Sequence, residues 1–152
     1  MTLAKETSMS PSEIDEFLGR METGVLSLAR EEDPYAIPIS FGYDATTRTF
    51  YFRLVSTPES KKRAFLESSP DVRLVVYDES NDKTTYWSVV ASGTLEEIDP
   101  SRMTVEQIEQ YGSAKRPLFE IWGAEKEELD IQLYRLSPEE LTGRQTDVER
   151  EE

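Results

Sequence analysis

The sequence predicts a mainly β fold, a small antiparallel β-barrel with flanking helices. Three observations support this prediction. Apolar stretches of strand length recur along the 152 residues, and turn-forming residues bound each of them. They follow one another at hairpin spacing with few long crossovers, which favours a barrel over a doubly wound sheet. The length suits one domain with a single hydrophobic core.

A helix is expected before the first strand. Ser10 can cap its N-terminus, Pro11 suits its first position, and Glu13 completes a capping box. Apolar residues then recur at helical spacing, at Ile14, Phe17, Leu18 and Met21. Residues 1–9, which precede this helix, are expected to form a flexible N-terminus.

Six strands are expected, each with alternating or dense apolar residues. They cover residues 25–29, 34–43, 49–54, 72–77, 86–98 and 129–136. Pro38 interrupts the second strand and cannot donate to a ladder, so it indicates an edge, a bulge or a backbone turned toward another group. Gly93 interrupts the fifth strand and predicts a bulge or a barrel corner.

Further helical segments are expected between the strands. Thr57 and Pro58 begin a helix that continues through residues 61–67. A second helix lies within residues 99–112, and a helical turn is expected at 117–122. The domain is expected to span residues 10–145, with a mobile chain from Thr142 that ends in an acidic tail at 146–152.

The composition excludes several classes of function. The chain has no cysteine and no histidine, so disulfides, thiolate metal sites and Ser-His or Cys-His catalysis are absent. The net charge of -14 repels nucleic-acid phosphates. No apolar run is long enough to span a membrane and no secretory signal is visible, so a cytoplasmic protein is expected. The acidity fits a halophilic type of surface better than disorder, because aromatic residues and strand patterns are plentiful.

A basic cluster stands out in this acidic chain. It comprises Arg53 at the end of a predicted strand and Lys61, Lys62 and Arg63 after Ser60 at a predicted helix start. Backbone N–H groups and the helix dipole favour an anion there, and phosphate suits both arginine and lysine. The alternative is that these are solvated charges that balance acidic neighbours.

Seven segments follow one another in an order that is specific as a series. They are Thr23–Ala29, Pro34–Asp44, Phe50–Arg53, Ser60–Lys62, Val72–Tyr77, Trp87–Gly93 and Leu133–Gly143. This series resembles the pyridoxamine 5'-phosphate oxidase-related, FMN-binding split-barrel family, over about residues 10–145. The resemblance implies a six-stranded antiparallel FMN-binding split barrel, with two chains that pair as a homodimer and hold FMN in a groove at their interface.

The residues that match the family's cofactor positions lie on the second, third and fifth strands and at the predicted helix start. They are Ile37, Pro38, Ile39, Ser40, Phe52, Arg53, Ser60, Lys61, Lys62, Trp87 and Ser88. The resemblance implies that the first four line the isoalloxazine ring and that the Ser-Lys-Lys triplet grips the phosphate. Trp87 and Ser88 would lie at the ring or the ribityl chain.

Two positions depart from the true oxidases of that family. Ala36 and Phe41 stand where those enzymes carry an arginine and a lysine that help hold phosphorylated cofactor and substrate. Pyridoxamine phosphate is therefore not the expected substrate. The expected activity is that of an FMN-dependent oxidoreductase on another small molecule, with no side chain that stands out as a catalytic acid or base.

Four alternatives stay open. The barrel could hold a deazaflavin or haem, it could be a non-enzymatic flavin carrier or sensor, or it could be a cofactor-free interaction module. Trp122 could stack on a flavin across a dimer interface, although core filling is the favoured reading of this residue.

Overall fold

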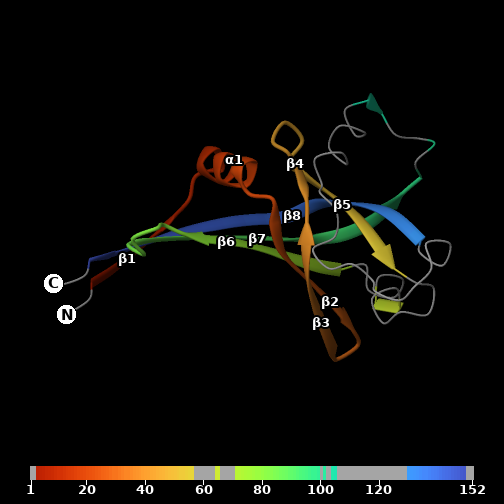
Figure 1. Ribbon diagram of the computed structural model, residues 1–152, viewed down its shortest axis with the longest axis horizontal. Helices are drawn as coiled ribbons and strands as arrows, with labels where there is room; N and C mark the ends of the chain where they lie inside the picture. Colours follow the sequence, from red (N-terminus) through yellow and green to blue (C-terminus); the bar gives the residue numbers. More distant parts are fainter. Residues whose placement is uncertain are drawn as a thin grey trace.

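An antiparallel eight-stranded sheet and one helix form the body of the computed structural model, which describes residues 3–56, 64–65, 71–99, 101, 104–105 and 130–149 (Figure 1). The elements are, in chain order, β1 Leu3–Ser8, α1 Pro11–Arg20, β2 Thr23–Arg30, β3 Asp33–Ser40, β4 Gly42–Asp44, β5 Thr49–Ser56, β6 Asp71–Glu79, β7 Thr85–Ile98 and β8 Asp130–Glu149. Seven strands neighbour one another in the order β3-β2-β6-β7-β8-β5-β4, and β1 pairs with β8. The predicted mainly β, antiparallel class is confirmed.

The barrel bends at Phe41, where the expected strand 34–43 divides into β3 and β4. β3 pairs with β2, whereas β4 pairs with β5 at the other end of the sheet. The Phe41 amide donates to the Glu22 carbonyl at 3.0 Å, and its buried ring meets the Phe50 ring edge-on at 5.6 Å. Residues 34–43 therefore pair with two different strands. The alternation of apolar residues in the sequence does not predict this change of partner.

The strand count of six was too low, because residues 34–43 divide into β3 and β4 and because residues 3–8 form a further strand. Residues 3–8 form β1 instead of an irregular N-terminus, and they pair with β8 from Leu3↔Glu149 to Ser8↔Arg144. β8 continues to Glu149 instead of ending at residue 136, so residues 142–149 also belong to the sheet. Ladder hydrogen bonds and the ion pair between Arg144 and Glu6, at 2.7 Å, hold this region together. The domain boundaries at 10 and 145 stay a prediction.

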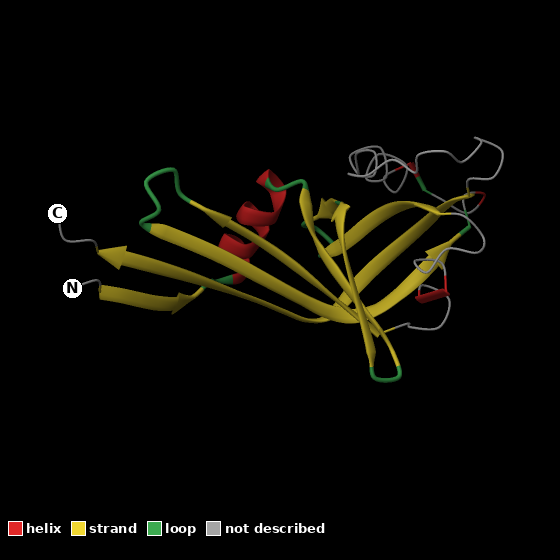
Figure 2. Ribbon diagram, turned by 60° about the horizontal axis from the view of Figure 1, so that its bottom comes forward, coloured by secondary structure: helices red, strands yellow, loops and turns green. Residues whose placement is uncertain are grey.

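Helix α1 confirms the predicted capping box. The Ser10 hydroxyl accepts from the Glu13 amide at 3.2 Å, and the Glu13 carboxylate accepts from the Ser10 amide at 2.9 Å. The predicted apolar face is buried through Ile14, Phe17 and Leu18. Figure 2 shows the helix lying beside the long strands. This packing covers one face of the sheet at the β7 and β8 side.

The approach of α1 to β8 depends on Gly143. A Cβ atom at this position would lie 2.9 Å from Ile14 Cγ1 and 2.9 Å from Met9 Sδ. The Met9 amide also donates to the Gly143 carbonyl at 2.9 Å. Only a residue without a side chain allows the helix and the strand to come this close.

The bulge predicted at Gly93 is confirmed by a register shift between Ser92 and Gly93 in the β7–β8 ladder. A Cβ atom at Gly93 would lie 3.0 Å from the Ser137 carbonyl oxygen. β7 can thus follow the sheet from the barrel into the long ribbon shared with β8 and β1.

The expected helices after β5 and β7 lie largely outside the described residues. Ala64 and Phe65 are helical, and the buried Phe65 ring stacks on Tyr35 of β3 at 4.9 Å. The remainder of the helix 61–67, most of the segment 99–112 and the turn 117–122, with Trp122, are outside the description. Within the part that the structure describes, no helix is long and apolar enough to cross a membrane.

Candidate functional site

The sheet has two faces with different compositions. In β6, burial alternates, so that Val72, Leu74 and Val76 are buried in the core while Arg73 and Tyr77 are exposed. β2 and β7 show the same alternation. We call the side that carries the core the inner face and the opposite side the outer face. α1 closes the inner face, because its buried side chains join the same core cluster.

The outer face carries a row of apolar side chains. The register aligns Pro38 of β3 with Val25 of β2, Val25 with Val75 of β6, and Val75 with Val90 of β7. We call these four residues the outer row. Because neighbouring strands lie about 4.8 Å apart, the row spans about 14 Å. A row of this width is a flat apolar surface on the side of the sheet that α1 does not cover.

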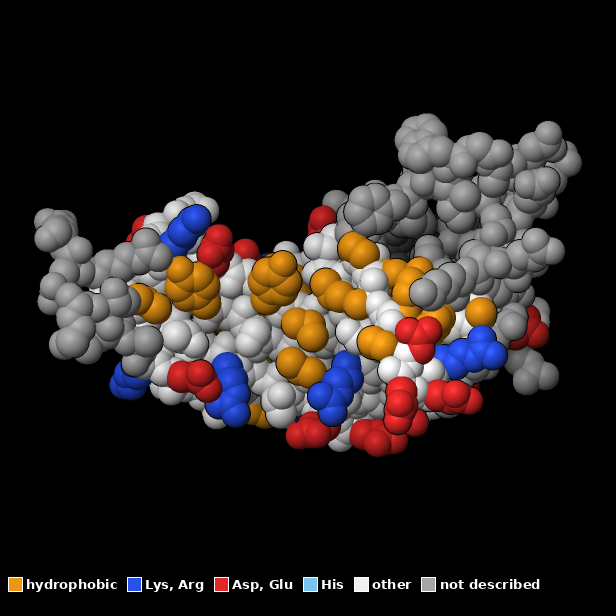
Figure 3. Space-filling view, turned by 90° about the horizontal axis from the view of Figure 1, so that it is seen from below, with side chains coloured by type: hydrophobic (Ala, Val, Ile, Leu, Met, Phe, Trp, Pro, Cys, Tyr) orange, Lys and Arg blue, Asp and Glu red, His pale blue; other side chains and the backbone are white. Residues whose placement is uncertain are grey.

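Exposed aromatic and charged side chains accompany the outer row. Tyr77 follows Val75 on the same face and is 66% exposed, and its ladder neighbours across the strands are Ser88 and Arg144. Figure 3 views the molecule from the side opposite α1 and shows hydrophobic side chains in a band, with charged side chains along one margin. An exposed aromatic residue within an apolar surface that charged residues border is typical of a binding interface.

β3 forms an edge of the sheet, as Pro38 indicated, since among the described strands it pairs only with β2. The ladder includes the bond from the Phe41 amide to the Glu22 carbonyl. Bonded pairs alternate in an antiparallel ladder, so Gly24↔Ile39 is a bonded pair and Val25↔Pro38 is not. The carbonyl of Pro38 consequently points away from β2, toward the open edge.

The predicted ring-lining segment on β3 is thus split between two directions. Ile37 and Ile39 turn their backbone groups toward β2 and their side chains toward the core. Pro38 is exposed on the outer face, and the Ser40 side chain is buried at the end of the strand. A ligand on the outer face can therefore contact Pro38 directly, whereas the two isoleucines support it from beneath.

The predicted pair on β7 is divided in the same way. Ser88 is exposed on the outer face, two residues from Val90 of the outer row. Trp87 points to the inner side, where its Nε1 donates to Gln145 Oε1 at 3.1 Å and its ring lies 6.3 Å from that of Phe17. The Arg20 guanidinium covers the indole at 4.7 Å. These residues line a cavity of about 280 Å³ under α1, so Trp87 and Ser88 face different spaces.

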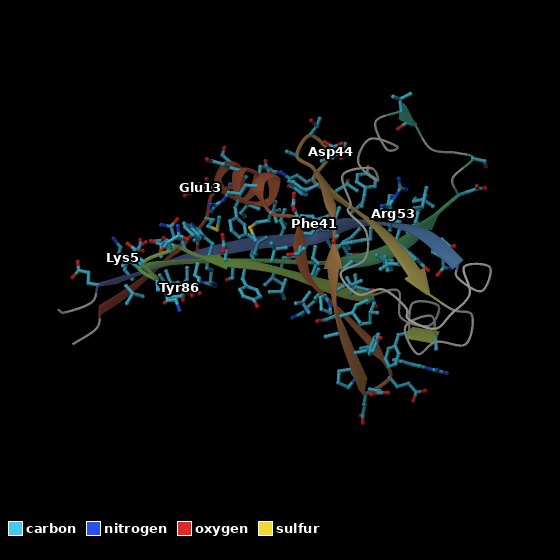
Figure 4. All side chains as sticks on the ribbon, in the orientation of Figure 1. Lys5, Glu13, Phe41, Asp44, Arg53 and Tyr86 are labelled. Atoms are coloured by element: carbon cyan, nitrogen blue, oxygen red, sulfur yellow. The ribbon has the colours of Figure 1, made fainter. Side chains whose placement is uncertain are left out.

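The predicted pair on β5 shows the same alternation. The Phe52 side chain is fully buried in the core, while Arg53 is half-buried between the buried residues Phe52 and Leu54 and so faces away from the core. Figure 4 places Arg53 on β5, far along the molecule from Lys5 and Tyr86. Ser60, Lys61 and Lys62 lie outside the described residues, so of the residues predicted to hold the phosphate only Arg53 is described.

A tyrosine network beside α1 has a structural role. The Tyr43 hydroxyl donates to Asp15 Oδ1 at 2.6 Å, and Arg48 pairs with Asp15 Oδ2 at 3.4 Å. Burial and the adjacent Asp15 carboxylate raise the pKa of Tyr43 well above its ordinary value. This hydroxyl therefore stays protonated near neutral pH and ties β4 to the helix.

Several residues of the outer face were not predicted as site residues from the sequence. Val25, Val75 and Val90 alternate with core residues, and the polar residues Ser27, Arg73 and Ser92 stand on the same face within otherwise apolar strands. A cavity of about 470 Å³ opens beside Ser27, Arg73 and Ser92. The available signal was period-two alternation, because each of these residues lies next to a buried core residue in its strand.

Comparisons with known proteins agree with this architecture. Residues 10–145 match the family model for pyridoxamine 5'-phosphate oxidase. No curated protein sequence matches the chain significantly.

Solved structures share the fold. A FAD-binding protein from Mesorhizobium loti is 20% identical with a TM-score of 0.69, covering 97% of this chain and 99% of its own. A FAD-binding protein from Mycobacterium smegmatis is 20% identical with a TM-score of 0.63, covering 93% and 98%. A heme-binding protein from Mycobacterium smegmatis is 13% identical with a TM-score of 0.60, covering 89% of this chain and 54% of its own. At these identities the likeness establishes the split-barrel fold.

Proposed function

Since the chain belongs to the pyridoxamine 5'-phosphate oxidase family, we propose that it is an FMN-binding flavoprotein that works as a flavin-dependent oxidoreductase. The observation that carries the proposal is the outer row, a flat apolar surface beside the exposed Ser88 and the open edge of β3. Such a surface offers a floor for a planar, mostly apolar ring, with hydrogen-bonding groups at its margin.

The proposed oligomer is a homodimer that pairs through the outer face. A single exposed valine costs little free energy. Val25, Val75 and Val90, however, form a continuous apolar surface with the exposed Tyr77, and a second copy of the chain can cover it. A two-fold dimer uses the same patch on both chains, so a self-complementary apolar strip suits it. A cofactor held between the chains links flavin binding to pairing.

Each residue of the proposed cofactor site would contact a different part of FMN. Pro38 presents its ring and its outward carbonyl, Ser88 presents a hydroxyl, and the outer row lies under the isoalloxazine ring. Arg53, together with Ser60, Lys61 and Lys62, supplies the phosphate grip in this proposal. The flavin supplies hydride and electron transfer, while these residues bind and orient it.

The proposed substrate is not pyridoxamine phosphate. The Phe41 ring is buried against Phe50, so position 41 offers no cation to a phosphate group. Ala36 is exposed and likewise has no charge. The two positions that hold phosphorylated ligands in the true oxidases therefore offer only apolar groups here.

Two other cofactors are outcomes of the test. Two relatives are FAD-binding proteins, and FAD contains the same isoalloxazine ring as FMN. FAD, or a deazaflavin with a ring of similar shape, could therefore lie on the same surface. The heme-binding relative raises a second candidate. The chain has neither histidine nor cysteine, which leaves methionine or tyrosine as axial ligands for haem. The flavin is favoured on this ground.

The test begins with purified protein in molar salt, incubated separately with FMN, FAD, a deazaflavin or haem and then desalted. We expect retained FMN at about one per chain, in a homodimer, and we propose that the protein acts in the cytoplasm. Retention of haem or a deazaflavin alone, or of no chromophore by the folded protein, would overturn the assignment. Bleaching of the flavin by candidate reductants under anaerobic conditions distinguishes an oxidoreductase from a carrier or sensor.

The phosphate grip is tested with Arg53→Ala and Lys61→Ala. We expect each to weaken FMN binding by about 1.5–3 kcal/mol, as for lost charge-assisted hydrogen bonds. Riboflavin, which lacks the phosphate, should bind the variants and the parent protein equally. The matched control is Arg30→Ala in the exposed β2–β3 hairpin, which should keep full FMN affinity. Unchanged FMN affinity in both test variants would show that Arg53 and Lys61 do not bind the phosphate of FMN.

A further inference from the structure

We infer that Arg73, Ser27 and Ser92 form a second oxyanion-binding site on the outer face, separate from the flavin phosphate grip and suited to a phosphate or carboxylate group of a small molecule. The strand register brings the three side chains together. Arg73 on β6 stands directly opposite Ser27 on β2 and Ser92 on β7. Directly opposed residues have Cβ atoms about 5 Å apart, so both hydroxyls flank the base of the arginine side chain.

The three polar side chains are available for a ligand. Arg73 is exposed, and within the described ranges its guanidinium makes no ion pair or hydrogen bond. The Ser27 and Ser92 hydroxyls have no hydrogen-bond partner among the same residues. By contrast, Arg144 on the same face is paired with Glu6 at 2.7 Å. Arg73 thus combines a free planar fork with one hydroxyl on the neighbouring strand at either side.

A cavity gives this constellation a shape. About 470 Å³ of space is lined by the three polar residues and by apolar groups that include Pro34 and Leu28. This volume accommodates a small molecule whose anionic end meets Arg73 while its body lies on the apolar wall. Ser27, Arg73 and Ser92 each lie two residues along their strand from a valine of the outer row. A ligand in the cavity would therefore lie beside the surface that is proposed to hold the flavin.

Acidic residues near the cavity affect how an anion can bind there. Asp71 and Glu139 also line the cavity, and the whole chain is strongly acidic. The surroundings therefore provide no general attraction for anions, so an oxyanion binds only where it accepts directed hydrogen bonds from the guanidinium and the hydroxyls. Arg73→Ala should consequently cause a larger loss of binding than removal of either hydroxyl.

The experiment is a titration of the isotope-labelled, FMN-loaded protein with inorganic phosphate and separately with acetate, followed through backbone amide shifts. We expect saturable shifts at Ser27, Arg73 and Ser92, a loss of affinity of at least tenfold in Arg73→Ala and a smaller loss in Ser27→Ala. Arg144→Ala is the matched control, an arginine of the same face that is already paired, and it should titrate like the parent protein.

The outcomes separate this site from the flavin grip. Arg73→Ala should keep FMN affinity within twofold, whereas Arg53→Ala should weaken FMN binding but keep the phosphate response in the apo protein. Equal titration of the parent protein and Arg73→Ala would overturn the inference. So would loss of FMN in Arg73→Ala with no phosphate response in the FMN-loaded protein, because Arg73 would then hold the phosphate of the cofactor itself.

Discussion

The inner and outer faces of β6 show how one strand can serve two purposes. Leu74 and Val76 point inward and have no exposed surface, whereas their neighbours Val75 and Tyr77 point outward, one half-buried and the other largely exposed. Both faces are apolar, but only the inner one is closed by α1 and the rest of the barrel. The difference indicates that inner side chains stabilise the monomer and outer ones are available for partners.

The largest expected effect is on the inner face. Leu74→Ala removes a fully buried side chain and leaves a cavity, so the free energy of unfolding should fall by about 2–5 kcal/mol. Urea denaturation followed by tryptophan fluorescence measures it, at a fixed protein concentration. Val75→Ala is the matched neighbour and should cost the isolated monomer less than about 1 kcal/mol. Equal losses in the two variants would contradict the separation of the faces.

A second prediction concerns the contact that closes the inner face. Gly143→Val inserts a side chain where Ile14 and Met9 already approach within 2.9 Å of the Cβ position. α1 must shift, and overpacking of this kind costs about 1–3 kcal/mol. Thermal unfolding measures the loss, and Gly19→Val is a control for position, because a Cβ atom at Gly19 would meet nothing within 4 Å. A fully stable Gly143→Val protein would show that α1 does not rest on β8 as described.

A third and smaller effect is expected at the start of α1. Ser10→Ala removes the hydroxyl that caps the helix and should lower the free energy of unfolding by about 1 kcal/mol. The acid side of the stability profile should also change in Glu13→Gln. Hydrogen bonds from the Ser10 backbone and then its side chain lower the pKa of Glu13 from 4.5.

The direction of this pH dependence follows from the lowered pKa. The ionised Glu13 contributes stability above pH 4.5, and the contribution is lost as the pH falls through that value toward the folded-state pKa. Glu13→Gln should therefore show a shallower loss of stability below pH 4.5 than the parent protein. Glu32→Gln in the exposed hairpin turn is the matched control for the removal of one surface carboxylate. If the free energy of unfolding of Glu13→Gln and of the parent protein depended on pH in the same way, the Glu13 carboxylate would not stabilise the helix through the capping box.

The sequence predicted the parts of the fold that have a strong local pattern. The capping box, the apolar face of α1, the edge at Pro38 and the bulge at Gly93 each depend on a few neighbouring residues with a specific physical role. β1 and the end of β8 were missed because they are polar on both faces, so no apolar alternation marks them. The break at Phe41 was missed because it depends on a change of strand partner.

The candidate site was predictable by segment but not by direction. Pro38, Arg53 and Ser88 face outward, whereas Ile37, Phe52 and Trp87 lie on predicted strands with their side chains on the inner side. Period-two alternation could have separated these two groups. The valines of the outer row and Arg73 could be recognised as one surface only after the register had aligned four strands.

The central claim is that the outer face holds both the partner chain and the flavin, and the most direct measurement is mass by light scattering combined with flavin absorbance for Val75→Glu. The account predicts that the parent protein has twice the 17.5 kDa chain mass with about one flavin per chain. Val75→Glu should be a folded, flavin-free monomer, and Thr47→Glu in an exposed turn should behave like the parent protein. A Val75→Glu protein that remains a flavin-loaded dimer would contradict the account.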